Sequence, residues 1–458
     1  MKYQRMKIAL LAGVAALLFS SCRVGKPYKE PDLGLPEAIA EKHDSLSIDT
    51  IRWQSIYKDP VLQSLIQRTL ENNKELKIAA ARMKEMAAMK QITLLNQLPD
   101  VGIQLTGQKE QLNYGGVAAN PDVEWNAKGV LSWELDLWGR LRYVHDADIA
   151  TFMQSVEAQY ALRVLLIAEV ASSYYELRAL DNELSIIQQT LLARREGVRL
   201  AKLRYEGGLT SETVYNQTLL ELARTETLLP ALERDIQIKE NELTTLLGEY
   251  VGEVIPRGLS LSDQLLPDQL PEGLSSTLLT RRPDIRQAEQ KLRESNARMG
   301  VAYASMFPRI GLTANLGVES DELSTLLKSP ARFIAGNLLQ PLVGLAKNRA
   351  SHKAAVARYE QDLLQYEQEV MQAFREVSNA LISRRKASEI RESQSELEEA
   401  ASNHVRLAQL QYINGVVNYY DVLDAQRGLL DAQLSLNDAI LEEQLSVVEL
   451  YKVLGGGY

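Results

Sequence analysis

Two carboxylates near the end of the chain are the residues best placed to do chemistry. Asp421 and Asp424 follow a turn at Asn414-Gly415 and stand at the start of a run with helical periodicity. Three residues apart on a helix, they share one face. If several copies of the chain met at this point, the carboxylates would form stacked rings of the kind that select cations and bind divalent ions. The competing interpretation is a pair of acids that stabilise a helix N-terminus through the macrodipole.

The rest of the chain lacks the spacings that catalysis or metal binding requires. No nucleophile elbow, phosphate-binding loop or HExxH motif occurs, which argues against an enzyme. The four histidines are scattered instead of grouped at metal-ligand spacing, so neither a metal site nor a cofactor is expected. The formal net charge is -9 and basic residues form only short pairs, which argues against a nucleic-acid partner.

The segment that carries the two aspartates belongs to the second copy of an internal duplication. A constant offset of 207 residues carries the turn glycine Gly208 onto Gly415. The same offset carries Val214 onto Asp421, so only the second copy can contribute a ring of carboxylates.

The N-terminus predicts export and lipidation. Residues 1–21 combine a basic start, an apolar stretch too short to span a bilayer as a mature helix, and small residues just before Cys22. We interpret 1–21 as a signal peptide and Cys22 as the acylated residue of a bacterial lipoprotein, with an ordinary secretory signal as the alternative. Cys22 is the one cysteine, and a lone cysteine in an exported chain has no disulfide partner, which favours lipidation. Proline-rich residues 22–59 are expected to form an extended tether.

Each copy of the duplication has the same predicted order: helix, two strands, a very long helix, a turn and a return helix. The first copy is 60–248, with a helical pattern from 60 to 97 and strands near 100–112 and 125–137. The second copy is 274–458, with strands near 309–319 and 331–342, and a linker, 249–273, joins the two. Helical periodicity also runs over 139–205 and 345–413, about 100 Å of helix each. Pro230 lies inside the first return helix and should kink or split it.

The predicted strands alternate apolar and polar residues with a period of two. In 125–137, Trp125 and Trp133 share the odd, apolar side, whereas Lys128 and Glu134 lie on the other. In a soluble sandwich the apolar side would meet a second sheet. In a membrane barrel it would meet lipid, with the tryptophans as anchors at the membrane interface. Four strands cannot close such a barrel, so the chain would have to oligomerise, and three copies would supply twelve strands.

Several motifs occur in an order that resembles the TolC/OprM-type outer-membrane factors, the exit ducts of tripartite efflux and secretion systems. They are the Cys22 segment followed by VGKPYKEP, ELDLWG at 134–139, RRPDI at 281–285 with its helix through Phe307-Pro308, YDVLDAQ at 420–426 and the ending ELYKVLGGGY. The resemblance covers nearly all of the mature chain. It implies a mainly α fold with a small β part: a homotrimer whose 12-stranded transmembrane β-barrel in the outer membrane continues into a long periplasmic α-helical barrel.

The resemblance also implies partners and a function. Such a duct passively exports small molecules that an inner-membrane pump and a periplasmic adaptor deliver, and it contacts outer-membrane lipid. The lipidated N-terminus and the GGGY ending favour drug efflux over metal efflux or protein secretion, the alternatives within this class. A lipid-tethered periplasmic coiled-coil protein without a pore is the alternative from another class. It would leave the alternating strands unexplained.

By the same resemblance, Asp421 and Asp424 line the periplasmic aperture and take part in its closure. The family often has an arginine just before the tyrosine of the second turn. Here Gln411 stands at that position, whereas Arg204 keeps the arginine in the first copy, so a charge latch through either residue stays open. The turns either dock the adaptor or only join the helices of each hairpin: Gly207, Gly208, Leu209 and Thr210 in the first, and Gly415, Val416, Val417 and Asn418 in the second.

Overall fold

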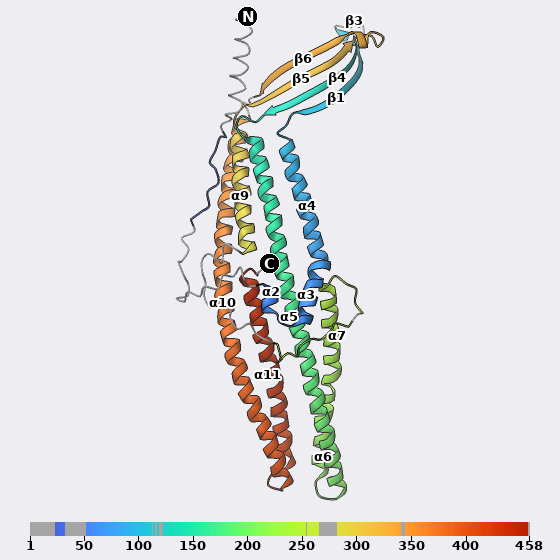
Figure 1. Cartoon of the computed structure of the whole chain (residues 1–458), viewed down its shortest axis with the longest axis vertical. Coiled ribbons are helices and arrows are strands. Elements are labelled where there is room, and N and C mark those ends of the chain that lie inside the picture. Colours follow the sequence, from blue (N-terminus) through green and yellow to red (C-terminus); the bar gives the residue numbers. More distant parts are fainter. Residues whose placement is uncertain are drawn as a thin grey trace. The chain divides into compact units, whose positions relative to one another are not determined.

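The structure, a computed structural model, describes residues 23–32, 52–111, 113–114, 117–118, 122–252, 254–264, 282–339 and 344–456. It is mainly helical with few strands, which confirms the predicted fold class at this level (Figure 1). The predicted signal peptide and Cys22 lie outside the described residues. The chain forms two compact units: unit 1 is Met1–Leu33, Ala81–Val156 and Arg286–Gln368, and unit 2 is Gly34–Ala80, Glu157–Ile285 and Glu369–Tyr458. Each unit therefore combines segments from both copies of the duplication.

Unit 1 contains a four-stranded antiparallel sheet. Its strands are β1 (Asp100–Glu110), β4 (Asp122–Leu135), β5 (Arg309–Ser320) and β6 (Pro330–Leu339), in the spatial order β1-β4-β5-β6. The central pairing of β4 with β5 joins the first copy to the second, and β1 and β6 form the two edges. Three short elements lie between these strands along the chain: β2 (Asn113–Tyr114), β3 (Val117–Ala118) and the 3-10 helix η2 (Leu326–Lys328).

The register of the sheet collects apolar positions of all four strands on one face. Ile103 lies opposite Gly129, which in turn lies opposite Leu316, and directly opposite residues share a face. Ile103 is 85% exposed and Leu316 is 72% exposed. The other face carries polar pairs, such as Lys128 and Glu319, whose charged atoms lie 2.5 Å apart. The same register adds further apolar residues to the first face: Val101, Leu105, Ala127, Leu131, Leu135, Ile310, Leu312, Ala314, Val318, Ile334 and Leu338.

Two side chains between β4 and the next helix, Asp136 and Trp138, connect the sheet of unit 1 to its helices. Unit 1 contains most of α9 (Pro283–Ala304) and parts of α4 (Lys74–Leu95), α5 (Arg140–Glu206) and α10 (Leu345–Ile413). Asp136, directly after β4, caps α5 by accepting hydrogen bonds from the Leu141 and Arg142 amides at 3.1 and 3.0 Å. Trp138 donates to the Pro308 carbonyl at 2.7 Å and stacks on Phe307, which joins the two strand–helix junctions. No helix in the described part of the chain is long and apolar enough to cross a membrane.

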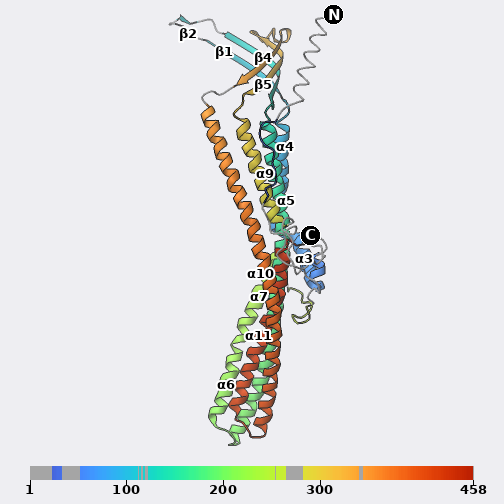
Figure 2. The same ribbon diagram turned by 90° about the vertical axis from the view of Figure 1, so that its left-hand side faces the viewer.

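Unit 2 contains α2 (Trp53–Ile56), α3 (Pro60–Asn72), α6 (Glu212–Glu226), α7 (Leu228–Leu246), α11 (Tyr419–Val453) and the remaining parts of α5 and α10 (Figures 1 and 2). Its interior contains Asp59, a fully buried carboxylate. Asp59 caps α3 by accepting from the Val61 amide at 2.8 Å. It also accepts from the Tyr174 hydroxyl at 2.7 Å and from the Leu259 amide at 2.9 Å, so it pins the linker between the two copies to α5.

Two helical patterns are divided in the structure. The pattern over 60–97 breaks at Asn73, whose side chain accepts from the Glu75 and Leu76 amides and so starts α4 as a separate helix. Periodicity within the segment does not show this break, because the position of Asn73 also depends on a distant contact. Its side chain donates to the Leu246 carbonyl, 173 residues away. The return helix divides between α6 and α7, as predicted from Pro230, because proline cannot donate to the carbonyl of the residue four positions earlier.

Candidate aperture at the two helix-hairpin turns

The two hairpin turns of unit 2 have the same backbone geometry, as their sequence relationship requires. In the first, Gly208 has a φ of 70°, and the Leu209 amide donates to the Arg204 carbonyl at 2.8 Å. In the second, Gly415 has a φ of 72°, and the Val416 amide donates to the Gln411 carbonyl at 2.9 Å. This is the Schellman helix ending, in which glycine adopts the left-handed conformation. Each long helix therefore ends in the same sharp turn.

Both aspartates lie exposed near the start of α11, Asp421 in its first turn and Asp424 in the next. Asp421 forms a capping box with Asn418: its carboxylate accepts from the Asn418 amide at 3.0 Å, and its own amide donates to the Asn418 side chain at 3.3 Å. Asp421 therefore does stabilise the helix N-terminus. Asp424 lies on the same exposed side, whereas Val422 and Leu423 between them are buried. The carboxylate of Asp424 is directed away from the core of its own chain, and the ring of three copies stays a prediction.

A buried carboxylate lies near these aspartates on the other hairpin. Glu221 of α6 is 2% exposed and is surrounded by three guanidinium groups. Those of Arg427, Arg194 and Arg224 lie at 2.6, 3.0 and 3.2 Å from its carboxylate. The hydrogen bond from Arg427 lowers the pKa of the Glu221 carboxyl; burial opposes this shift, and the positive charges of Arg427, Arg194 and Arg224 reinforce it. Glu221 is thus an ion-paired carboxylate held by residues of both hairpins.

Sequence analysis did not identify this cluster. Arg427 continues the three-residue step of Asp421 and Asp424 along one side of a helix, and this spacing is the one signal that points to it. Nothing in the sequence indicates that its partner is Glu221, because the two residues are 206 positions apart and meet through the packing of two different hairpins.

Two aromatic contacts also join the hairpins. Arg204 of α5 lies over the ring of Tyr412 of α10, with its guanidinium carbon 4.5 Å from the ring centre. The structure thus places Arg204 in a cation–π contact across the hairpins. Tyr419 at the start of α11 lies so close to Gly197 of α5 that a Cβ at Gly197 would lie 2.5 Å from the tyrosine hydroxyl. The glycine inside α5 therefore has a packing role.

The tips of both turns expose apolar side chains. Leu209 is 77% exposed and Val416 is 70% exposed. Polar residues would be enough to form these turns, so the turn itself does not require apolar side chains there. Exposed apolar residues at a rigid tip suit contact with a protein partner. Docking of an adaptor at these turns stays a prediction.

The two tryptophans of β4 lie on the apolar face of the sheet. Trp133 donates its indole N–H to the Gln97 carbonyl at 3.0 Å, beyond the end of α4. Trp125 lies opposite Gly107 and covers it, because a Cβ at Gly107 would lie 2.5 Å from the indole ring. Trp125 is 37% exposed. Both residues thus combine packing with position on the apolar face, and their role as membrane-interface anchors stays a prediction.

Among the described residues, no group of three or more His, Cys, Asp or Glu side chains is arranged to hold a metal ion.

The chain matches known proteins along nearly its whole length. The family described as outer membrane efflux protein matches residues 65–249 and 274–456. The solvent efflux pump outer membrane protein SrpC of Pseudomonas putida is 32% identical to the chain, with 99% of each protein covered. The probable outer membrane lipoprotein SilC of Salmonella typhimurium is 29% identical, again with 99% of each protein covered.

A solved structure of CusC has the same fold, with a TM-score of 0.88 and 27% sequence identity. The match covers 95% of this chain and 100% of CusC. CusC of Escherichia coli is described as a cation efflux system protein. These matches confirm the resemblance to outer-membrane factors and the outer-membrane location, and they set aside the coiled-coil protein without a pore. The chain belongs to the outer membrane efflux protein family, whose members are channel proteins and not enzymes.

Proposed function

We propose that three copies of this chain form the outer-membrane exit duct of a tripartite efflux pump. The observation that carries the proposal is the four-stranded sheet, which has one exposed apolar face and two open edges, β1 and β6. Pairing β6 of one copy with β1 of the next would join three sheets into a 12-stranded barrel with no free edge. The apolar face would meet lipid, and the face with Lys128 and Glu319 would line a wet lumen.

The helices of unit 2 would then form the periplasmic part of the duct and its aperture. Three copies of Asp421 and Asp424 would make two rings of carboxylates at its mouth, and such rings favour cations. The Arg427–Glu221 and Arg204–Tyr412 contacts support a closed arrangement, because they hold the second hairpin against the first in each copy. Opening of the mouth requires these contacts to loosen.

The proposed partners rest on the position of the turns and on relatives that are described as outer membrane proteins of efflux pumps. A periplasmic adaptor would dock on the tips around Leu209 and Val416, where apolar side chains are exposed. An inner-membrane pump would supply the energy, and transport through the duct itself would be passive. The lipid on Cys22 and the tryptophans Trp125 and Trp133 would anchor the duct in the outer membrane.

Export of drugs and other small molecules is the substrate class that we favour. Relatives carry descriptions that name solvents and cations, so metal efflux is the second candidate. Three of the nine methionines, Met83, Met86 and Met89, lie three residues apart on α4, so thioether ligands that a soft metal prefers are present at one helical segment. If drugs are the substrates, loss of the protein should sensitise cells to several of them. Sensitisation to copper or silver salts alone would favour metal efflux.

The test of the duct is single-channel conductance in a planar bilayer, with the wild type beside Asp421→Asn/Asp424→Asn. Asparagine removes both charges and keeps an acceptor for the Asn418 amide, so the capping box need not be lost. We expect small cation-selective steps in the wild type, and larger and less cation-selective steps in the variant. Asp431→Asn is the control, because it neutralises an exposed carboxylate farther along α11. Pores unaffected by the double substitution would place the constriction elsewhere, and the absence of pores from folded protein would refute the duct.

A further inference from the structure

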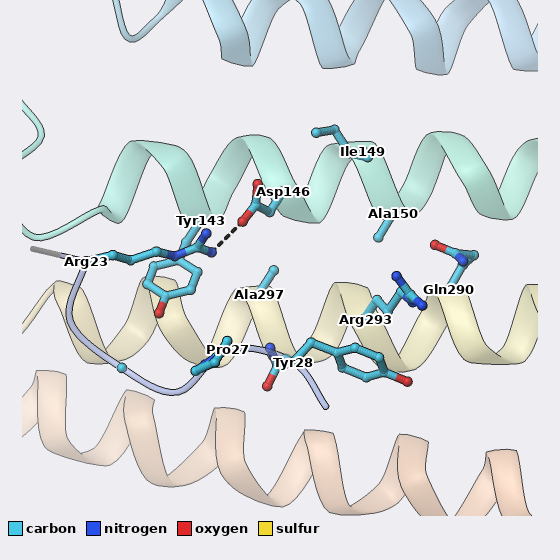
Figure 3. A pocket seen from close by; sticks show the side chains of 12 residues that line it. Arg23, Pro27, Tyr28, Tyr143, Asp146, Ile149, Ala150, Gln290, Arg293 and Ala297 are labelled. Atoms are coloured by element: carbon cyan, nitrogen blue, oxygen red, sulfur yellow. Dashed lines mark hydrogen bonds and ion pairs between the residues drawn. The ribbon is translucent and has the colours of Figure 1, made fainter. Parts of the chain in front are cut away.

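The first described residues of the chain lie against the helices of unit 1. Residues 23–28 run beside α5 and α9, and Figure 3 shows Arg23, Pro27 and Tyr28 along one side of a pocket of about 420 Å³. The Val24 amide donates to the Trp138 carbonyl at 3.3 Å, so the segment is bound to the α5 junction through its backbone. Farther along, the guanidinium of Arg293 from α9 lies 4.8 Å from the centre of the Tyr28 ring.

Tyr143 of α5 is the centre of this arrangement. It is 2% exposed, and its hydroxyl donates to the Val24 carbonyl at 2.8 Å. The guanidinium carbon of Arg23 lies 3.7 Å from the centre of the Tyr143 ring, and Arg23 also pairs with Asp146, one turn farther along α5 (Figure 3). One aromatic side chain therefore contacts Arg23 through its ring and binds the backbone of Val24 through its hydroxyl.

Two glycines make room for this tyrosine. Gly25 has a φ of +113°, a backbone angle that residues with a side chain rarely adopt. A Cβ at this position would also lie 2.6 Å from the Tyr143 hydroxyl. Gly300 lies inside α9, and a Cβ there would overlap the Tyr143 ring. A glycine inside a helix costs about 0.5–1 kcal/mol relative to alanine, so its presence at Gly300 is explained by the space that Tyr143 needs.

We propose that Tyr143, seated between Gly25 and Gly300, is a clasp that holds residues 23–28 on α5 and α9 independently of the lipid on Cys22. The clasp makes Tyr143 a positioning residue, because it fixes Arg23 and Val24 on α5. The inference concerns unit 1 alone, and its failure would leave the proposed duct and aperture untouched.

Hydrogen–deuterium exchange of the purified full-length protein tests the clasp, with the peptide that contains residues 23–32 as the reporter. Tyr143→Phe keeps the ring and removes the hydrogen bond to the Val24 carbonyl, so the segment should open more often and exchange of the reporter peptide should accelerate about fivefold. Gly300→Ala should displace the ring and accelerate exchange by tenfold or more. Exchange in the helices of unit 2 should stay unchanged, which separates release of the clasp from general loss of stability.

Two variants are controls, and a third, Cys22→Ser, tests whether the segment stays bound without the lipid. Tyr303→Phe removes a hydroxyl from another tyrosine of unit 1 and leaves its ring contacts with Phe307 and His352. Gly428→Ala places the same methyl group in a helix where nothing lies within 4 Å. Cys22→Ser removes the lipid, and we expect exchange of 23–32 to match the wild type in all three. Wild-type exchange in Tyr143→Phe would overturn the clasp, as would release of 23–32 by Cys22→Ser alone.

Discussion

The guanidinium of Arg427 lies 2.6 Å from the carboxylate of Glu221, and this contact joins α11 of the second hairpin to α6 of the first. Arg224 also pairs with Glu221, but it lies on α6 itself, three residues farther along. The two arginines therefore differ in one respect that matters: only Arg427 links the hairpins. This difference allows the link to be tested without neutralising Glu221.

Replacement of Arg427 with glutamine should loosen the mouth of the duct. A hydrogen bond between charged groups contributes about 1.5–3 kcal/mol, so its loss should favour the open arrangement of each copy by a factor of about 10 to 100. We expect a higher resting conductance in planar bilayers for Arg427→Gln and a resting conductance near the wild type for Arg224→Gln. Equal effects of the two substitutions would show that the charge of Glu221, and not the link between hairpins, controls the pore.

Alanine should have opposite effects at two helical glycines. At Gly428 a Cβ meets nothing within 4 Å, so Gly428→Ala should raise stability by about 0.5–1 kcal/mol through helix propensity alone. At Gly197 the same group lies 2.5 Å from the Tyr419 hydroxyl, so Gly197→Ala should lower stability by about 1–3 kcal/mol. Thermal unfolding of the purified protein, followed by circular dichroism, measures both changes. A stabilising Gly197→Ala would mean that Tyr419 moves aside without cost.

Lysine should be tolerated on one face of the sheet and not on the other. Ile103 and Gln104 are neighbours on β1, and adjacent strand residues point to opposite faces. If the apolar face meets lipid, Ile103→Lys should cost about 2–4 kcal/mol near the middle of the membrane, whereas Gln104→Lys should cost little. The measurement is the fraction of folded, heat-modifiable protein recovered in outer membranes. Equal recovery of the two variants would contradict a lipid-facing sheet.

Asp59 should make the stability of unit 2 sensitive to acid. Burial alone would raise the pKa of Asp59, but hydrogen bonds from Gln264, Tyr174 and the Val61 and Leu259 amides outweigh it and lower the pKa below 3.8. A lowered folded-state pKa contributes stability that is present above pH 3.8 and is lost as the pH falls through the folded-state value.

Asp59→Asn tests this contribution. At neutral pH the substitution should cost about 1.5–3 kcal/mol, because asparagine cannot accept all of the hydrogen bonds that the carboxylate accepts. The difference between wild type and variant, measured in denaturant titrations, should shrink as the pH falls from 3.8 through the folded-state pKa of Asp59. A difference that does not shrink at all as the pH is lowered below 3.8 would contradict a lowered pKa of Asp59. Asp431→Asn, at an exposed position, should show neither effect.

Short-range patterns in the sequence predict most of the local elements of this protein. Apolar residues with a period of two mark the strands around Ile103 and Trp133, and the turn glycines Gly208 and Gly415 end the two long helices. Asp421 and Asp424 could be placed together for the same reason, because a spacing of three puts them on one side of a single helix. Each of these features depends on contacts within a few residues, which periodicity and turn chemistry report directly.

The tertiary structure alone decided the contacts between distant segments. Glu221 meets Arg427 and Tyr419 meets Gly197 because helices about two hundred residues apart in the sequence pack at one particular rotation and height. Tyr143 meets Val24 because the N-terminal segment lies against α5, more than a hundred residues away in the sequence. Side-chain spacing along one helix does not determine that rotation, which depends on the summed packing of many residues. The sequence by itself thus determined the strands, the turns and the long helices, and its motifs indicated the family, but not the break between α3 and α4. Packing in three dimensions determined which charges are paired and where the N-terminal segment is held.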